Sequence, residues 1–156
     1  MSKSHKRVVA ALEASGVEFT LRHEEDLTRT AVEAAAAAGC AVDQIAKSII
    51  WKGGDSGKAL LFITAGGRRV DEARAESLAG EPLLRADAAF IRETTGFAIG
   101  GVSPVGHIAE VRAWIDAELM KFDVIWAAAG TPRDNFAISP ADLEKISGAQ
   151  VSEFSS

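Results

Sequence analysis

The sequence predicts a single α/β (α+β) domain over residues 1–156, built on a mixed, twisted, barrel-like β-sheet flanked by short helices. Apolar residues at helical spacing alternate along the chain with runs at strand spacing, without the regular repeat of a βαβ protein. No internal repeat or low-complexity linker divides the 156 residues, and this length suits one hydrophobic core. Hydrophobic residues make up 47% and charged residues 25%, the balance of a globular protein.

Charge and cysteine content restrict the partners and the setting. A net charge of −5 argues against coating long nucleic acid through many phosphate contacts, but it is compatible with local binding of a few nucleotides. The single cysteine, Cys40, follows Gly39 as a packing residue and excludes an internal disulfide, which favours a reducing cytoplasm. No signal peptide or membrane-length apolar run is visible. We therefore expect a cytoplasmic protein without a multi-cysteine metal site. A monomer or weak dimer is the default expectation, and no metal or cofactor is expected.

The first half of the chain predicts two helices and three strands. Apolar residues at helical spacing, followed by Gly16, indicate a helix over about Ser4–Ser15. A capping box at Thr30 and Glu33 opens a second helix, which continues through an alanine run to Gly39. The strands are expected at Val17–Arg22 (half-buried), Lys47–Lys52 (after a helical turn at Asp43–Ala46) and Ala59–Ala65 (buried on both faces).

The second half predicts three capped helices and further short strands. Asp71, Asp87 and Ser139 are the predicted N-caps of helices over Glu72–Ala79, from Ala88 to about Thr94, and from Pro140 to Gly148. Strands are expected at Leu83–Leu84, Val124–Ala129 and Phe136–Ile138, whereas Ile108–Ile115 fits a helix or an edge strand equally well. Trp51 and Trp126 lie in apolar strands and are expected in the core.

The segment Thr94–His107 holds four glycines and a proline around an apolar triplet. Glycine lets a backbone approach a ligand closely, so such a loop can present bare N–H groups to a carbonyl, carboxylate or phosphate oxygen. The simpler interpretation is a tight connection between a helix that ends at Gly96 and a following strand.

Two further features are predicted to share one cleft with this loop. Lys47 stands at the start of a buried strand, where its amine serves as an anion clamp or simply extends to solvent. Gly130-Thr131-Pro132 ends another buried strand. Ser103 donates to a substrate or completes a turn, and His107 is an acid–base group or a loop histidine bonded to backbone.

These residues resemble a known family. Lys47-Ser48-Ile49-Ile50, Arg85-Ala86-Asp87, Thr95–Gly106 and Gly130-Thr131, in this order, are similar to the YbaK/EbsC (ProX-like) aminoacyl-tRNA deacylases. Those proteins are relatives of the editing domain of bacterial prolyl-tRNA synthetases. The similarity extends from the first helix to the helix at Ser139.

The resemblance implies hydrolysis, in trans, of the ester of a mischarged tRNA, such as tRNA(Pro) carrying alanine or cysteine. Lys47 would contact the tRNA 3′ acceptor end, and prolyl-tRNA synthetase is a possible partner. The loop residues Gly100, Gly101, Val102 and Ser103 would bind the acyl group through N–H groups and stabilise the oxyanion while water or a substrate group attacks. Further substrate contacts are expected from Pro104, Gly106, His107, Ala128, Gly130 and Thr131.

The sequence departs from the family pattern after Gly130. An aspartate of some cysteine-removing members appears here as Asn135, with Asp134 beside it, which leaves the role of that carboxylate open. Two other functions also fit the residues: a non-catalytic regulatory module that binds an aminoacyl or nucleotide group, and a small-molecule hydrolase that uses the same loop.

Overall fold

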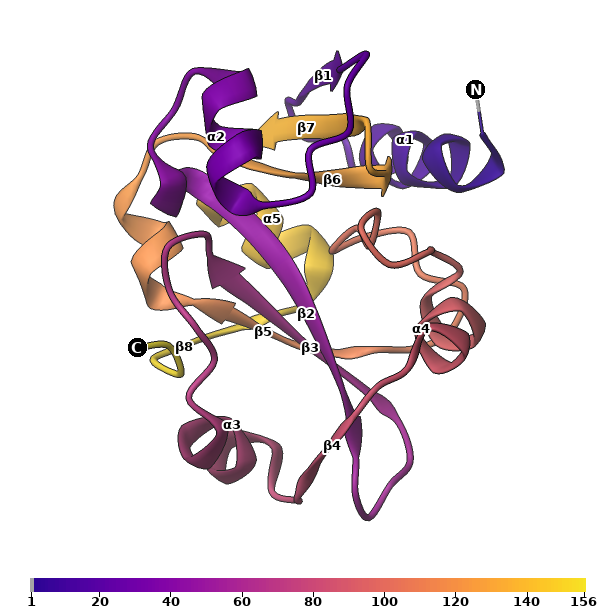
Figure 1. Cartoon of the computed structure of the whole chain (residues 1–156), viewed down its shortest axis with the longest axis vertical. Coiled ribbons are helices and arrows are strands. Elements are labelled where there is room, and N and C mark those ends of the chain that lie inside the picture. Colours follow the sequence, from indigo (N-terminus) through magenta and orange to yellow (C-terminus); the bar gives the residue numbers. More distant parts are fainter. Residues whose placement is uncertain (1) are drawn as a thin grey trace.

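Residues 2–156 are described by a computed structural model, which is built on one eight-stranded mixed sheet (Figure 1). The strand order is β1-β7-β6-β2-β3-β5-β8, and β4 pairs with β2 outside this path. The β2/β6, β3/β5 and β5/β8 pairs are parallel, whereas β1/β7, β6/β7, β2/β3 and β2/β4 are antiparallel. The predicted mixed α/β fold is confirmed. Within these residues, no helix has the length and apolar character needed to cross a bilayer.

The centre of the sheet is formed by β2 (Ile45–Gly53), β3 (Ala59–Ala65) and β5 (Arg112–Asp116). All seven residues of β3 are buried, as their continuous apolar pattern predicts. On one face Phe62 stacks on Trp114 with ring centroids 4.8 Å apart, and on the other Ile63 and Ile115 join the main core.

The expectation of a helix or edge strand at Ile108–Ile115 is wrong in part. A strand forms only from Arg112, and it lies inside the sheet between β3 and β8 rather than at an edge. Its two faces are both covered, because Trp114 and Ile115 pack in different core clusters.

The outer strands are β1 (Thr20–His23), β4 (Leu83–Arg85), β6 (Ile125–Thr131), β7 (Asp134–Ile138) and β8 (Gln150–Ser152). The expected half-buried strand at Val17–Arg22 begins only at Thr20, and all four residues of β1 are exposed. Val17 and Phe19 instead pack against the core just before the strand. The strand β1 thus gains its stability from backbone pairing with β7.

Five helices surround the sheet: α1 (Lys3–Ser15), α2 (Ala31–Ala38), α3 (Glu72–Ala79), α4 (Ala88–Thr95) and α5 (Pro140–Ser147). The predicted caps form, since the Thr30, Asp71, Asp87 and Ser139 side chains each accept a first-turn N–H, and Gly39 ends α2 in the left-handed region. Short 3₁₀ helices occupy Val42–Gln44 and Ala117–Lys121. The turn therefore begins one residue before the expected segment Asp43–Ala46, and Ile45 and Ala46 already belong to β2.

The strand β2 has an open edge. Opposite β3, it pairs with β6 only through Ile45 and Ala46, and with β4 only from Trp51 to Gly53. Within residues 2–156, no strand pairs with this edge over the intervening residues 47–50. Since successive strand residues direct their backbone groups to opposite edges, some N–H and C=O groups of this stretch remain available there.

Helix α1 fastens the end of β6. The Ser4 hydroxyl donates to the Gly130 carbonyl (2.8 Å), and His5 Nδ1 donates to the Ala129 carbonyl (2.7 Å). Gly130 has φ +95°, and a Cβ there would lie 2.7 Å from the Ser4 carbonyl oxygen. Only glycine therefore fits between α1 and the β6–β7 turn.

We predict that Gly130→Ala lowers the free energy of unfolding by at least about 3 kcal/mol, because backbone strain and a steric clash add at one site. The matched control is Gly57→Ala, since Gly57 has φ +70° but nothing within 4 Å of a Cβ, and it should cost about 1–2 kcal/mol. Urea unfolding measures both values. Equal losses of unfolding free energy in the two variants would contradict the close approach of α1 to Gly130.

Candidate functional site

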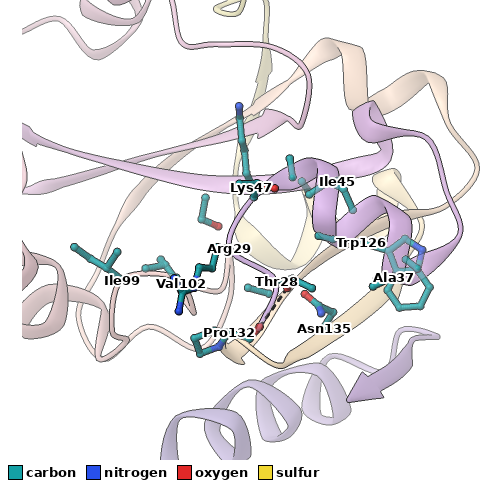
Figure 2. Close-up of a pocket in the computed structure, with 18 of the residues that line it drawn as sticks. Thr28, Arg29, Ala37, Ile45, Lys47, Ile99, Val102, Trp126, Pro132 and Asn135 are labelled. Atoms are coloured by element: carbon teal, nitrogen blue, oxygen red, sulfur yellow. Dashed lines mark hydrogen bonds between the residues drawn. The ribbon is translucent and has the colours of Figure 1, made fainter. Parts of the chain in front are cut away.

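A cavity of about 440 Å³ lies at the open edge of β2 (Figure 2). It is bounded by β2, by α2, by the loop around Gly100 and by β6 and β7. All residues of β2 from Ile45 to Ile50 line it, which is expected where the backbone itself forms a wall. The other lining residues are Arg22, Glu24, Thr28, Arg29, Thr30, Ala31, Ala34, Ala37, Ala38, Ile91, Ile99, Gly100, Val102, Trp126, Ala128, Pro132 and Asn135.

The cavity walls are mostly small and apolar. Alanines of α2, β2 and β6 provide much of the surface, and the half-buried Trp126 forms part of the wall rather than lying in the core as expected. The one carboxylate among the lining residues, Glu24, is bound by Arg22, so no ligand set for a metal converges here. Arg29 is exposed and adds a positive charge to the lining. This surface suits a small apolar group attached to an anionic one.

The loop that follows α4 brings its backbone to the cavity. Gly100 (φ +92°) and Val102 line the cavity, whereas a Cβ on Gly101 would lie 2.7 Å from the Thr131 Cα. The Gly101 N–H donates to the Ala98 carbonyl (3.0 Å) and closes a turn. Within residues 2–156, the N–H groups of Gly100, Val102 and Ser103 donate to no backbone acceptor. Of these three residues, Gly100 and Val102 lie in the cavity wall, where their N–H groups are available to a ligand.

Ser103 is fully buried and outside the cavity. Its hydroxyl accepts from the Val105 N–H (3.2 Å), and its carbonyl accepts from His107 Nε2 (2.7 Å). The side chain therefore fixes the loop, and only its backbone N–H is left for the role expected at the acyl group.

The Lys47 amine turns away from the loop. Nζ donates to the Arg68 carbonyl (2.5 Å) and the Gly66 carbonyl (3.2 Å), and Figure 2 shows the side chain extending away from Ile99 and Val102. Burial lowers the pKa of this ammonium, and Arg69 lowers it further, while Asp43 and Asp116 act in the opposite direction. Lys47 thus lines the cavity, with its charge behind the strand.

The structure does not bring all predicted site residues together. Pro104, Gly106 and His107 line a second cavity of about 460 Å³, between α1 and α5. Gly130 and Thr131 support the Gly100 loop and the β6–β7 turn without lining the first cavity, whereas Ala128 lies in its wall.

The side chains of Asp134 and Asn135 have different surroundings. Asn135 lines the cavity, whereas Asp134 accepts from the Thr131 hydroxyl (2.6 Å) and His23 Nδ1 (2.7 Å). Burial alone would raise the pKa of Asp134, but these two hydrogen bonds and the nearby His5 hold it below its usual value. The Asp134 carboxylate is therefore occupied by hydrogen bonds at the β6–β7 turn, and the Asn135 amide is the group available to a ligand.

Sequence reasoning missed several cavity residues. Arg29 and Thr28 lie in a segment without periodicity, so no pattern could place them. Trp126 could have been found, because strand alternation puts it on the face opposite the buried Ala127. The same alternation supports the cavity position of Asn135, which the sequence had indicated only through its departure from the family pattern. The Ser48 hydroxyl also went unnoticed: it is buried in the wall and has no partner within the described chain. Such a group is usually satisfied by water or a ligand.

Comparison with known proteins places this geometry in a family. A family model described as aminoacyl-tRNA editing domain matches residues 25–146, which include every strand from β2 to β7. The chain therefore belongs to the aminoacyl-tRNA editing domain family, and the resemblance seen in the sequence is confirmed at this level.

Individual relatives support this family assignment. A solved structure described as a candidate trans-editing enzyme for prolyl-tRNA synthetase is 42% identical, with a TM-score of 0.91 over 100% of this chain and 99% of that one. The hypothetical protein APE2540 is 28% identical, with a TM-score of 0.89 over 96% and 99% of the two chains. The uncharacterized protein YwhH of Bacillus subtilis (strain 168) is 26% identical over 127 residues, or 81% of this chain and 80% of that protein.

The environment of His107 predicts a pH dependence of stability. Burial lowers the pKa of its imidazole below the ordinary 6.5, the Arg7 charge lowers it too, and the Ser103 carbonyl raises it. The unfolded chain then binds the proton more readily, so this group destabilises the fold as pH falls through and below 6.5. We expect the free energy of unfolding to decrease from pH 7.5 to 5.5, and His107→Gln to flatten that slope. An unchanged slope in urea titrations of the variant would contradict the assignment.

Proposed function

We propose that the protein is a trans-editing deacylase that hydrolyses the ester between a wrong amino acid and a tRNA, with the acyl group in the cavity beside β2. The observation that carries the proposal is the combination, in an editing-domain chain, of loop N–H groups with an open strand edge around one apolar hollow. We further propose tRNA(Pro) as the carrier and the cytoplasm as the setting, with the chain acting as a monomer or weak dimer alongside prolyl-tRNA synthetase.

The proposed chemistry is addition of water to the acyl carbon. The carbonyl oxygen becomes an oxyanion, and the N–H groups of Gly100, Val102 and Ser103 stabilise it. The bond from carbon to the ribose oxygen then breaks, that oxygen takes one proton of the added water, the other proton goes to solvent, and the amino acid leaves as its carboxylate. The Lys47 ammonium, held behind β2 by the Gly66 and Arg68 carbonyls, adds a positive potential from that side of the cavity wall. The Asn135 amide can hydrogen-bond the α-amino group.

The walls favour a small side chain. Alanines at Ala34, Ala37 and Ala128 leave an apolar surface, which supports alanine or cysteine as the removed residue. An apolar pocket separates substrates by only about 1–3 kcal/mol per methylene, so two small residues can both be accepted.

The test is a deacylation assay over a panel of mischarged tRNAs, with Lys47→Met beside the wild type. We expect release of alanine or cysteine from tRNA(Pro), and a loss in kcat of about tenfold for Lys47→Met, because the positive charge behind the β2 wall of the cavity is removed. The control is Lys58→Met, which removes an exposed lysine from the β2–β3 hairpin and should leave kcat unchanged.

Three outcomes would revise the proposal. Full activity of Lys47→Met would limit this lysine to its bonds with Gly66 and Arg68. Tight binding of a non-hydrolysable aminoacyl-adenosine without turnover on any tRNA would favour a non-catalytic binding module, a role consistent with the lack of a carboxylate–histidine pair in the lining. Activity that needs no tRNA body would indicate a small-molecule hydrolase.

Arg29 is predicted to bind a phosphate of the tRNA 3′ end. Arg29→Ala should raise KM about five- to tenfold with little change in kcat, and it should reduce the slope of log KM against log salt by about one. Lys145→Ala serves as the control, because it removes an exposed charge at the second cavity instead. A larger effect of Lys145→Ala on KM would indicate that the tRNA 3′ end binds beside the second cavity instead.

A further inference from the structure

One side chain of α1 holds both ends of the loop that borders the cavity. Arg7 Nε donates to the Gly106 carbonyl (2.8 Å), and its terminal Nη2 donates to the Gly96 carbonyl (2.9 Å). The two carbonyls lie ten residues apart in the sequence, and the segment 98–103, in which the Gly100, Val102 and Ser103 N–H groups have no backbone acceptor, runs between them. A single guanidinium therefore closes the base of the loop.

The contact between helix and loop is close enough to require glycine at both ends. Gly96 (φ +82°) would bring a Cβ within 2.4 Å of the guanidinium, and Gly106 (φ +81°) would bring one within 3.3 Å of the Arg7 carbonyl oxygen. Both residues are in the left-handed region, which other residues seldom adopt. The two glycines thus shape the loop base around Arg7.

The anchor extends from Arg7 into the loop through buried groups. The guanidinium lies 4.8 Å from the ring centroid of Phe97, which is fully buried. Phe97 in turn meets the His107 ring edge-to-face at 6.0 Å, and His107 donates to the Ser103 carbonyl. The Ser103 peptide is therefore tied to α1 through three successive contacts.

We propose that Arg7 is a positioning residue for the deacylation reaction: its fork fixes Gly96 and Gly106, and thereby aims the N–H groups of Val102 and Ser103 at the substrate carbonyl. This inference rests on the proposed function. Arg7 lies outside residues 25–146, the part matched by the family model. It does not line the cavity, so its effect passes through the loop backbone.

The proposed positioning role requires an arginine rather than a lysine at residue 7. The planar guanidinium presents several donors in a fixed arrangement and stacks on an aromatic ring, whereas the lysine ammonium is a point charge on a flexible stem. Arg7→Lys keeps the charge but cannot hold both carbonyls in one geometry. Misplacement of oxyanion donors by about 1 Å costs on the order of 10²-fold in rate.

The experiment compares Arg7→Lys and Arg7→Met with Lys6→Met, a change at the neighbouring exposed cation on the same helix. We expect both Arg7 variants to lose about 10- to 100-fold in kcat, with KM for aminoacyl-tRNA within about threefold of wild type. Lys6→Met should match wild type in both constants. Activities are compared at a temperature where circular dichroism shows each variant to be folded.

Hydrogen exchange of the free protein gives a second, activity-independent readout. The amides of Gly101 and Val105, which donate to the Ala98 carbonyl and the Ser103 hydroxyl, should exchange at least about tenfold faster in Arg7→Lys than in Lys6→Met, while the β3 amides keep their protection. Wild-type kcat in Arg7→Lys, or equal exchange in the two variants, would overturn the positioning role. A wild type without deacylase activity would refute the proposed function instead, and the exchange rates would still decide whether Arg7 fixes the loop.

Discussion

The arrangement of the site depends on one constraint: β2 leaves β6 after two paired residues and does not meet β4 until Trp51. A sheet opened in this way exposes main-chain donors and acceptors that require partners, because buried polar groups without them are costly. Here α2 and the Gly100 loop cover the opening without filling it. The hollow that remains has a polar backbone edge and apolar side-chain walls, which is the combination that an acyl ester needs.

The opposite wall is held by contacts from the rest of the chain. Gly101 rests on the Thr131 backbone, Ser103 is buried, and Arg7 joins the loop ends, so the segment at the cavity has little freedom to move. Preorganised donors of this kind stabilise developing charge without reorganisation during the reaction. Helix α1 thus contributes to the site although its residues stand at some distance from the cavity.

Much of the fold was predictable because its signals are local. Helix caps such as Thr30 and Ser139, and the continuous apolar run of β3, correctly predicted where elements lie. The site was predictable only in part. The motif around Gly100 indicated the loop, but nothing in the sequence showed that the Lys47 amine binds two carbonyls, or that His107 lies at a second cavity. Such contacts depend on long-range packing, which periodicity and spacing in the sequence do not reveal.

The most direct test of the account is a crystal structure with a non-hydrolysable aminoacyl-adenosine, in which an amide replaces the ester. We predict that its carbonyl oxygen lies within hydrogen-bond distance of the N–H groups of Val102 or Ser103, with the side chain against Ala128. Binding in the second cavity beside His107, or in the first without contact to the loop N–H groups, would contradict the central claim.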